Sequence, residues 1–246
     1  MVLFSGTGCQ IAGLLSFLKD RTYKGSLVTV DLICGGIPSK ILIDKFISQA
    51  PYKVKRVLSF RTKETGWKPR GFRYNLKVED ENGKIYDYAN KNNLITTGFS
   101  LELTNRYSCY DCPFVGKNRK SDFTIGDYWG CIKYDEEHFD GISLIIAHTD
   151  KARQFLSSLK DSLFYDKADM NLAISHNHRL VTGHSIQQYF FERKLLAFFS
   201  SHLSDSVFSK VYAYTFSNKS PWILLKVIRK VYGIVVVIID RIGHKQ

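Results

Sequence analysis

The sequence predicts an α/β fold with α+β insertions: a partly parallel sheet with βαβ units, an inserted β-hairpin and a C-terminal helical region. The first observation is the order of the opening segments, where an apolar strand, a glycine-rich turn, an amphipathic helix and a β-branched run follow one another. The second is an Asn-Gly turn between two segments that alternate in polarity, which favours a hairpin because Asn-Gly tolerates positive φ. The third is helical spacing over residues 185–202.

The opening segments place two cysteines together. We expect a strand at residues 2–4, a turn at 5–8, a helix at 9–18 and a second strand at 27–33. A βαβ unit makes its two strands parallel, and parallel strands end at the same edge of a sheet. Cys9 follows the first strand and Cys34 follows the second, so both are expected at this edge.

The remaining elements follow in order. The hairpin is expected over residues 72–80 and 84–89, then a helix over 93–104, a strand over 142–147 and a helix that begins at Thr149 or Asp150 and reaches about residue 159. The pattern weakens over 163–182 before the helix at 185–202. We predict one domain over 1–215 and a basic amphipathic helical tail over 216–246.

That tail carries Lys226, Arg229 and Lys230 on one helical face. Core packing is the default interpretation of its apolar residues. The alternative is docking of residues 221–242 on a membrane surface or a partner helix, because basic amphipathic helices do both.

Composition excludes several classes of protein. Of the 246 residues, 44% are hydrophobic and 24% are charged, which is typical of a folded globular chain and not of a disordered one. The net charge of +12 attracts anions such as phosphates, flavin nucleotides, acidic lipids or nucleic acids, without choosing among them. No apolar run approaches the roughly 20 residues of a membrane-spanning helix. Five cysteines without a recognisable secretory leader argue against a disulfide scaffold and favour a reducing cytoplasm.

Four of those cysteines form the candidate site. Cys109 and Cys112 have C-x-x-C spacing, which lets two sulfurs reach one centre, and thiolates select iron–sulfur clusters, zinc or Cu(I). Cys9 and Cys34 lie beside glycines, which permit close backbone approach and amide-to-sulfur hydrogen bonds. The alternative for these two is that each is a small buried apolar residue. Cys131 lacks a comparable setting and is expected to be a free thiol.

The motifs around these cysteines resemble a family, the beta subunit of coenzyme F420 hydrogenase/dehydrogenase, in its C-terminal domain and its bacterial relatives. Residues 4–14 are similar to the family's F-S-G-T-P-C-Q-x-A-G-L, and residues 30–39 to its V-D-L-x-C-H-G-x-P-S. Residues 60–67 resemble F-R-x-K-x-x-G-W, residues 108–112 resemble S-C-Y-x-C, and residues 121–129 resemble S-D-x-T-x-G-D-x-W. Together these motifs span about residues 1–149.

The resemblance implies an iron–sulfur flavoprotein that transfers electrons between a [4Fe-4S] cluster and a flavin or deazaflavin-like acceptor, coenzyme F420 in some members. It implies a redox partner protein or ferredoxin-like domain, and some bacterial relatives are associated with surface-polysaccharide genes. Nucleic acid is not an expected partner, and no catalytic residue is assigned. The implied cluster ligands are Cys9, Cys34, Cys109 and Cys112, and the implied FAD-binding residues are Thr7, Arg61, Lys63, Trp67, Asp127 and Trp129.

The sequence also departs from the family pattern. Gly8 stands where the family has Pro, Gly35 stands where it has His, and the family's N-terminal ferredoxin-like portion is not recognisable. We therefore expect a fragment or a truncated gene product that retains flavin weakly. Basic residues around Trp67 suit a flavin phosphate and a stacked ring, although an exposed basic loop explains them equally well.

A function of a different class uses the same cysteines. Zinc accepts four thiolates, so the chain could be a zinc-stabilised basic binding module without redox activity. Zinc sites usually pair two close C-x-x-C knuckles, whereas Cys9 and Cys34 stand apart.

Overall fold

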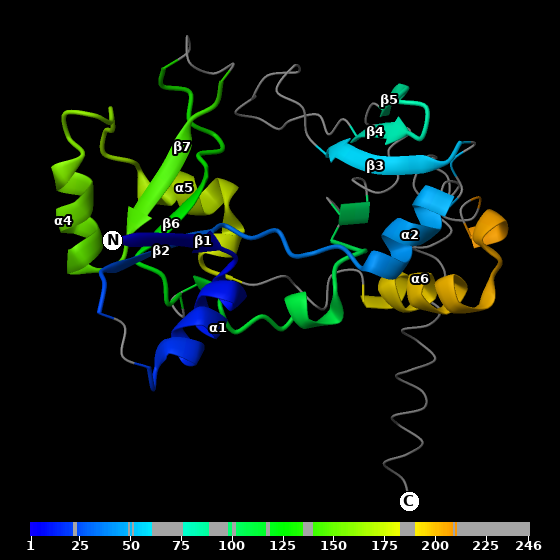
Figure 1. Ribbon diagram of the computed structural model, residues 1–246, viewed down its shortest axis with the longest axis horizontal. Coiled ribbons are helices and arrows are strands. Elements are labelled where there is room, and N and C mark those ends of the chain that lie inside the picture. The colour runs from blue at the N-terminus through cyan, green and yellow to red at the C-terminus, as the bar shows by residue number, and fades with distance from the viewer. Residues whose placement is uncertain are drawn as a thin grey trace, which may run out of the picture. The chain divides into compact units, whose positions relative to one another are not determined.

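The computed structural model describes residues 1–21, 24–48, 50, 52–60, 76–88, 98–99, 102–116, 119–134, 140–182, 190–208 and 210. They form two compact units. The first unit takes its described residues from Met1–Ile37 and Tyr107–Ser185, and the second from Pro38–Thr62, Arg73–Arg106 and Ile186–Gln246. The α/β class is confirmed, since mixed sheets and helices alternate along the chain (Figure 1).

The first unit is a four-stranded sheet of order β1-β2-β6-β7. Its strands are β1 (Val2–Gly6), β2 (Leu27–Leu32), β6 (Phe123–Asp127) and β7 (Ser143–Ala147). The β1–β2 and β2–β6 pairs are parallel, and the β6–β7 pair is antiparallel. The predicted βαβ unit is therefore confirmed, while β6 extends the parallel part of the sheet beyond what the sequence predicted.

Helix α1 (Gly8–Leu18) connects the first two strands and packs against both. Thr7 is its N-cap, and the Gln10 side chain accepts a hydrogen bond from the Thr7 backbone N–H at 2.8 Å. This bond satisfies a donor that the first helical turn leaves free. Ile11, one turn into the helix, is fully buried. The turn between β1 and α1 is shorter than the predicted turn over residues 5–8, because β1 continues to Gly6.

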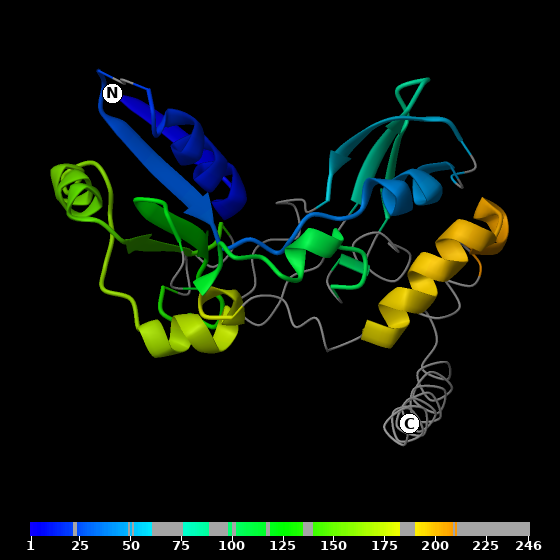
Figure 2. The ribbon, with the colours of Figure 1, turned by 90° about the horizontal axis from the view of Figure 1, so that it is seen from below.

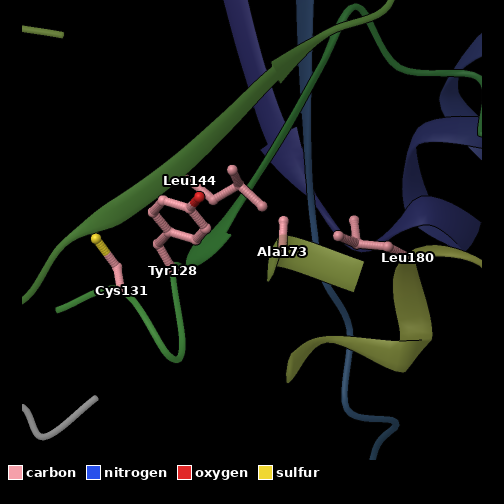
Figure 3. Close-up of a cluster of buried hydrophobic side chains, with 5 residues drawn as sticks. All are labelled: Tyr128, Cys131, Leu144, Ala173 and Leu180. Carbon is pink, nitrogen blue, oxygen red and sulfur yellow. The ribbon is translucent and has the colours of Figure 1, made fainter. Parts of the chain in front are cut away.

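Two apolar cores cover the two faces of this sheet. Because side chains alternate along a strand, Val28 and Phe123 face helix α4 (Asp150–Ser158), where Ala152 is fully buried. The opposite face carries Leu144 against helix α5 (Met170–His176) and the 3-10 turn η6 (His178–Leu180). Figure 3 shows this second core, which consists of Tyr128, Cys131, Leu144, Ala173 and Leu180.

Cys131 lies inside this second core and is 4% exposed. Its neighbours in this core are apolar, and its thiol donates a long hydrogen bond of 3.8 Å to the Lys133 carbonyl oxygen. The fifth cysteine is therefore a packed apolar residue with a free thiol, in agreement with its predicted separation from the other four.

The second unit holds the predicted hairpin. Strands β4 (Leu76–Asp80) and β5 (Ile85–Tyr88) are antiparallel, and β3 (Val54–Ser59) pairs with β4 on its other side (Figure 2). Gly83 has φ of +80°, which the Asn-Gly turn requires. The Asp80 carboxylate accepts hydrogen bonds from the backbone N–H groups of Asn82 and Lys84, both at 2.9 Å. The hairpin is confirmed, and β3 makes it a three-stranded sheet.

The second unit also contains helices α2 (Lys40–Ser48) and α6 (Phe190–His202). A core of Leu103, Leu196 and Phe208 includes contacts from α6. Helix α6 confirms the described part of the helix predicted over 185–202. Most of the helix predicted over 93–104, the beginning of the strand predicted from residue 72, and the tail over 216–246 lie outside the described residues. None of the described helices is long and apolar enough to cross a membrane.

Candidate metal centre

Four cysteines line one pocket of the first unit. Cys9 lies in the first turn of α1, and Cys34 follows β2 at the carboxyl edge of the sheet. Cys109 ends the 3-10 turn η3 (Tyr107–Cys109), and Cys112 follows three residues later. The parallel pairing of β1 with β2 explains why Cys9 and Cys34 meet, because both strands end at this edge.

Local hydrogen bonds hold the two cysteines at the sheet edge. The Thr7 hydroxyl lies 3.1 Å from the Cys9 sulfur, so the residue that caps α1 also contacts a candidate ligand. The Gly36 backbone N–H donates to the Cys34 sulfur at 3.3 Å. Gly36 has φ of +87°, a conformation that only glycine adopts without strain. The loop after β2 therefore depends on Gly36 to direct an amide at a thiol.

The other three cysteines of the pocket act electrostatically on Cys34. Burial raises the pKa of Cys34, the Gly36 amide opposes this effect, and the negative charges of Cys109, Cys9 and Cys112 raise the pKa further. Ionising all four thiols in one partly buried pocket is therefore unfavourable for the protein alone. A bound cationic centre would offset this repulsion, because metal ligation deprotonates cysteine.

The pocket offers a volume of about 40 Å³, which exceeds the roughly 10–15 Å³ that a single water needs. Within the described ranges, no three histidine, cysteine, aspartate or glutamate side chains form a group that could hold one metal ion. The four cysteines are among the residues that line this space. Four thiolates around such a space fit the donor set of an iron–sulfur cluster.

The candidate flavin residues are distributed differently. Thr7 lines the pocket. Asp127 ends β6, where its backbone carbonyl oxygen accepts a hydrogen bond from the Asn177 amide at 3.1 Å, and Trp129 is partly buried two residues later. Neither Asp127 nor Trp129 is among the residues that line the pocket. Arg61, Lys63 and Trp67 lie outside the described residues.

A buried ion pair beside the thiols was not predicted. Arg119 lines the pocket with its side chain 4% exposed, and its Nη1 donates to Asp31 Oδ2 at 2.9 Å. Asp31 is fully buried on β2. The sequence did contain a signal for this ion pair, namely a carboxylate within an otherwise uncharged, β-branched strand. A charge buried in such a strand requires a partner of opposite charge. The sequence could not say that the partner is 88 residues away.

The ion pair continues into a hydrogen-bonded chain across the sheet. The Thr124 hydroxyl donates to Asp31 Oδ1 at 2.5 Å and lies 2.7 Å from His148 Nε2. A hydroxyl has one proton and an ionised carboxylate only accepts, so His148 Nε2 is the donor to Thr124. Burial lowers the pKa of His148, Asp31 opposes this effect and the Arg119 cation adds to it. The charge on Arg119 therefore affects the pKa of His148 in addition to pairing with Asp31.

Comparison with known proteins agrees with the motifs. The family model for the C terminus of the coenzyme F420 hydrogenase/dehydrogenase beta subunit matches residues 1–171. The chain belongs to this family. The predicted resemblance is thus confirmed, and membership in this oxidoreductase family points to electron transfer in general.

One solved structure that matches this chain is a chain of the F420-reducing [NiFe] hydrogenase complex from Methanosarcina barkeri, determined after xenon derivatization. The sequence identity is 17% and the TM-score is 0.40, with 73% of this chain and 58% of that chain covered. This family member thus spans little more than half of the length of the hydrogenase chain. No curated protein matches the chain.

Proposed function

We propose that the chain holds a [4Fe-4S] cluster on Cys9, Cys34, Cys109 and Cys112 and serves as an electron-transfer subunit of an oxidoreductase. The observation that carries this proposal is the shared pocket of these four thiols in the first unit. Bound there, the cluster would accept and release single electrons. The family, whose members are oxidoreductase subunits, supports the same class of chemistry.

The protein residues have separate tasks in this proposal. The thiolates provide the ligands, and the Gly36 amide donates to the Cys34 sulfur, a type of hydrogen bond that stabilises negative charge on a ligand. Cys9 lies in the first turn of α1, where the positive end of the helix dipole would stabilise the negative charge of the proposed cluster. Both features lower the cost of gathering negative charge in the pocket.

The electron acceptor is proposed to be a flavin such as FAD, or a deazaflavin-like compound. We assign Thr7 to the flavin-binding residues; the assignment is supported by its position in the lining of the thiol pocket and by the family motif that contains it. Arg61, Lys63 and Trp67 would supply phosphate pairing and ring stacking, with Asp127 and Trp129 as further flavin contacts. A redox partner protein or ferredoxin-like domain would deliver the electrons.

The proposal is tested by following electrons through the purified chain. Protein prepared without oxygen and reduced with dithionite should lose its visible absorption. FAD added after the excess dithionite is removed should restore the absorption of the cluster, with two reduced clusters oxidised, and two protons taken from solvent, for each FAD that is reduced to FADH2. The Cys131→Ser variant is the matched control, since this thiol lies in the apolar core and should leave both steps intact. A chain with visible absorption that dithionite cannot bleach would contradict electron transfer, and stoichiometric zinc would favour the non-redox binding module.

A further inference from the structure

Arg119 is a buried cation on the wall of the thiol pocket. Its side chain is 4% exposed and contributes to the pocket lining. Its Nε lies buried without a hydrogen-bond partner among the described protein groups. A buried guanidinium normally uses its donors fully, because an unsatisfied buried donor is costly. Arg119 therefore brings both a positive charge and a spare N–H donor to this region.

The position of the guanidinium is fixed from three sides. Nη1 donates to Asp31 Oδ2 and also to the Leu32 carbonyl oxygen at 3.2 Å, and Nη2 donates to the Arg179 carbonyl oxygen at 3.2 Å. Asp31 is itself fixed by the Thr124 hydroxyl. These bonds oppose rotation of the guanidinium toward solvent. Its field is a permanent property of the site.

We propose that Arg119 raises the reduction potential of the cluster and that Asp31 limits this effect. The inference rests on the proposed function. Reduction adds one electron to a site that already has four thiolate ligands, and neither a bond nor a proton is exchanged. A fixed positive charge stabilises the more negative reduced form more than the oxidised form, and burial keeps the interaction strong. Asp31 is the negatively charged member of the same ion pair, so it lowers the reduction potential of the cluster.

The opposed signs provide the test. We expect Arg119→Gln to lower the reduction potential of the cluster and Asp31→Asn to raise it. Each shift should change the ratio of reduced to oxidised cluster about tenfold at a fixed solution potential, which corresponds to roughly 59 mV for one electron. The double variant should return close to the wild-type potential. Arg119→Lys, which keeps the charge, should change it least. The control is Arg153→Gln, which removes the same charge from an exposed arginine on α4 that pairs with Asp150.

The measurement is an anaerobic redox titration of the full chain with dithionite and mediators, followed by EPR of the reduced cluster. Shifts of equal sign in Arg119→Gln and Asp31→Asn, or a shift in Arg153→Gln as large as theirs, would overturn the assignment. If Arg119→Gln fails to assemble a cluster, Asp31→Asn decides, because a potential no higher than that of the wild type would overturn the assignment. Wild-type protein without a cluster would refute the proposed function itself, whereas a wild-type cluster whose potential is unshifted in Arg119→Gln and Asp31→Asn would refute only the role of Arg119.

Discussion

Asp122 offers a direct test of how the first unit is held together. Its carboxylate accepts hydrogen bonds from the Thr29 N–H at 2.9 Å, the Thr29 hydroxyl at 3.1 Å and the Thr149 hydroxyl at 2.8 Å, and it pairs with Lys151 at 2.7 Å. It thereby ties β2 to the residue that caps α4. The motif that contains Asp122 resembles a family element, but these contacts give it a structural task.

The magnitude follows from those partners. Lys151 is half-exposed, so its ion pair contributes roughly 0–1 kcal/mol. The Thr29 N–H is buried and would lose its carboxylate partner in Asp122→Ala, which costs about 1–3 kcal/mol, and hydrogen bonds to charged groups add about 1.5–3 kcal/mol. The cost of the unsatisfied N–H and the value of the lost hydrogen bonds overlap and do not add in full, so we expect Asp122→Ala to lower the free energy of unfolding by about 3–4 kcal/mol. Asp122→Asn keeps one carbonyl oxygen as an acceptor and should cost about 1–2 kcal/mol.

The pH dependence has a definite sign. Burial would raise the pKa of Asp122, but hydrogen bonds from Lys151, Thr29 and Thr149 outweigh it and hold the pKa below its usual value. A group with a lowered folded pKa stabilises the protein above its unfolded pKa, about 3.9 for Asp, and loses this contribution as the pH falls through the folded pKa. The difference between wild type and Asp122→Asn should therefore shrink below about pH 4.

Urea unfolding followed by far-UV circular dichroism at pH 7 and at acidic pH measures both effects. Asp150→Asn is the matched control, because Asp150 is a carboxylate near the same helix end with its side chain 89% exposed. The reasoning is refuted if Asp122→Ala costs no more than Asp150→Asn, or if the deficit of Asp122→Asn is unchanged at low pH.

Three further predictions concern the pocket and its cofactors. Cys34→Ser and Cys112→Ser should each lose most of the bound iron while Cys131→Ser keeps it, and equal loss in all three would contradict the ligand assignment. Gly36→Ala should destabilise the protein by about 1 kcal/mol because φ is +87°, whereas Gly13→Ala should not, since nothing lies within 4 Å of an added Cβ there; equal melting temperatures for the two variants would contradict this. The chain should purify with little flavin, because Thr7 is the one candidate flavin residue among the described residues that lines the thiol pocket, and each 1.4 kcal/mol of contact energy changes the dissociation constant about tenfold; tight, stoichiometric FAD on the chain would contradict this.

The sequence predicted those elements that local signals define. The strand, capped helix and second strand at the start, and the hairpin at Asn82-Gly83, each carry their own pattern of apolar and turn residues. Strand β6 was not predicted, because Asp122 and Thr124 interrupt its apolar pattern. The structure explains these polar residues by their bonds to β2, a partner more than 90 residues away.

Helix α5 was missed for a different reason. It is short and lies in a stretch with a weak apolar pattern, so helical periodicity has little room to appear. Its signal was Asp169, whose carboxylate accepts hydrogen bonds from the N–H groups of Asn171 and Leu172 at the helix start.

The sequence predicted some residues of the candidate site and missed others. Strand direction predicted that Cys9 and Cys34 meet at one edge, and the structure brings Cys109 and Cys112 to the same pocket. Their role as ligands stays a prediction. Arg119 could not be found from the sequence, since its importance arises only from burial beside Asp31.

The most direct test of the central claim is the metal and sulfide content of the chain purified without oxygen. We expect about four iron and four acid-labile sulfide per chain, with little zinc, and an EPR signal that appears on reduction with dithionite. Stoichiometric zinc without sulfide would contradict it.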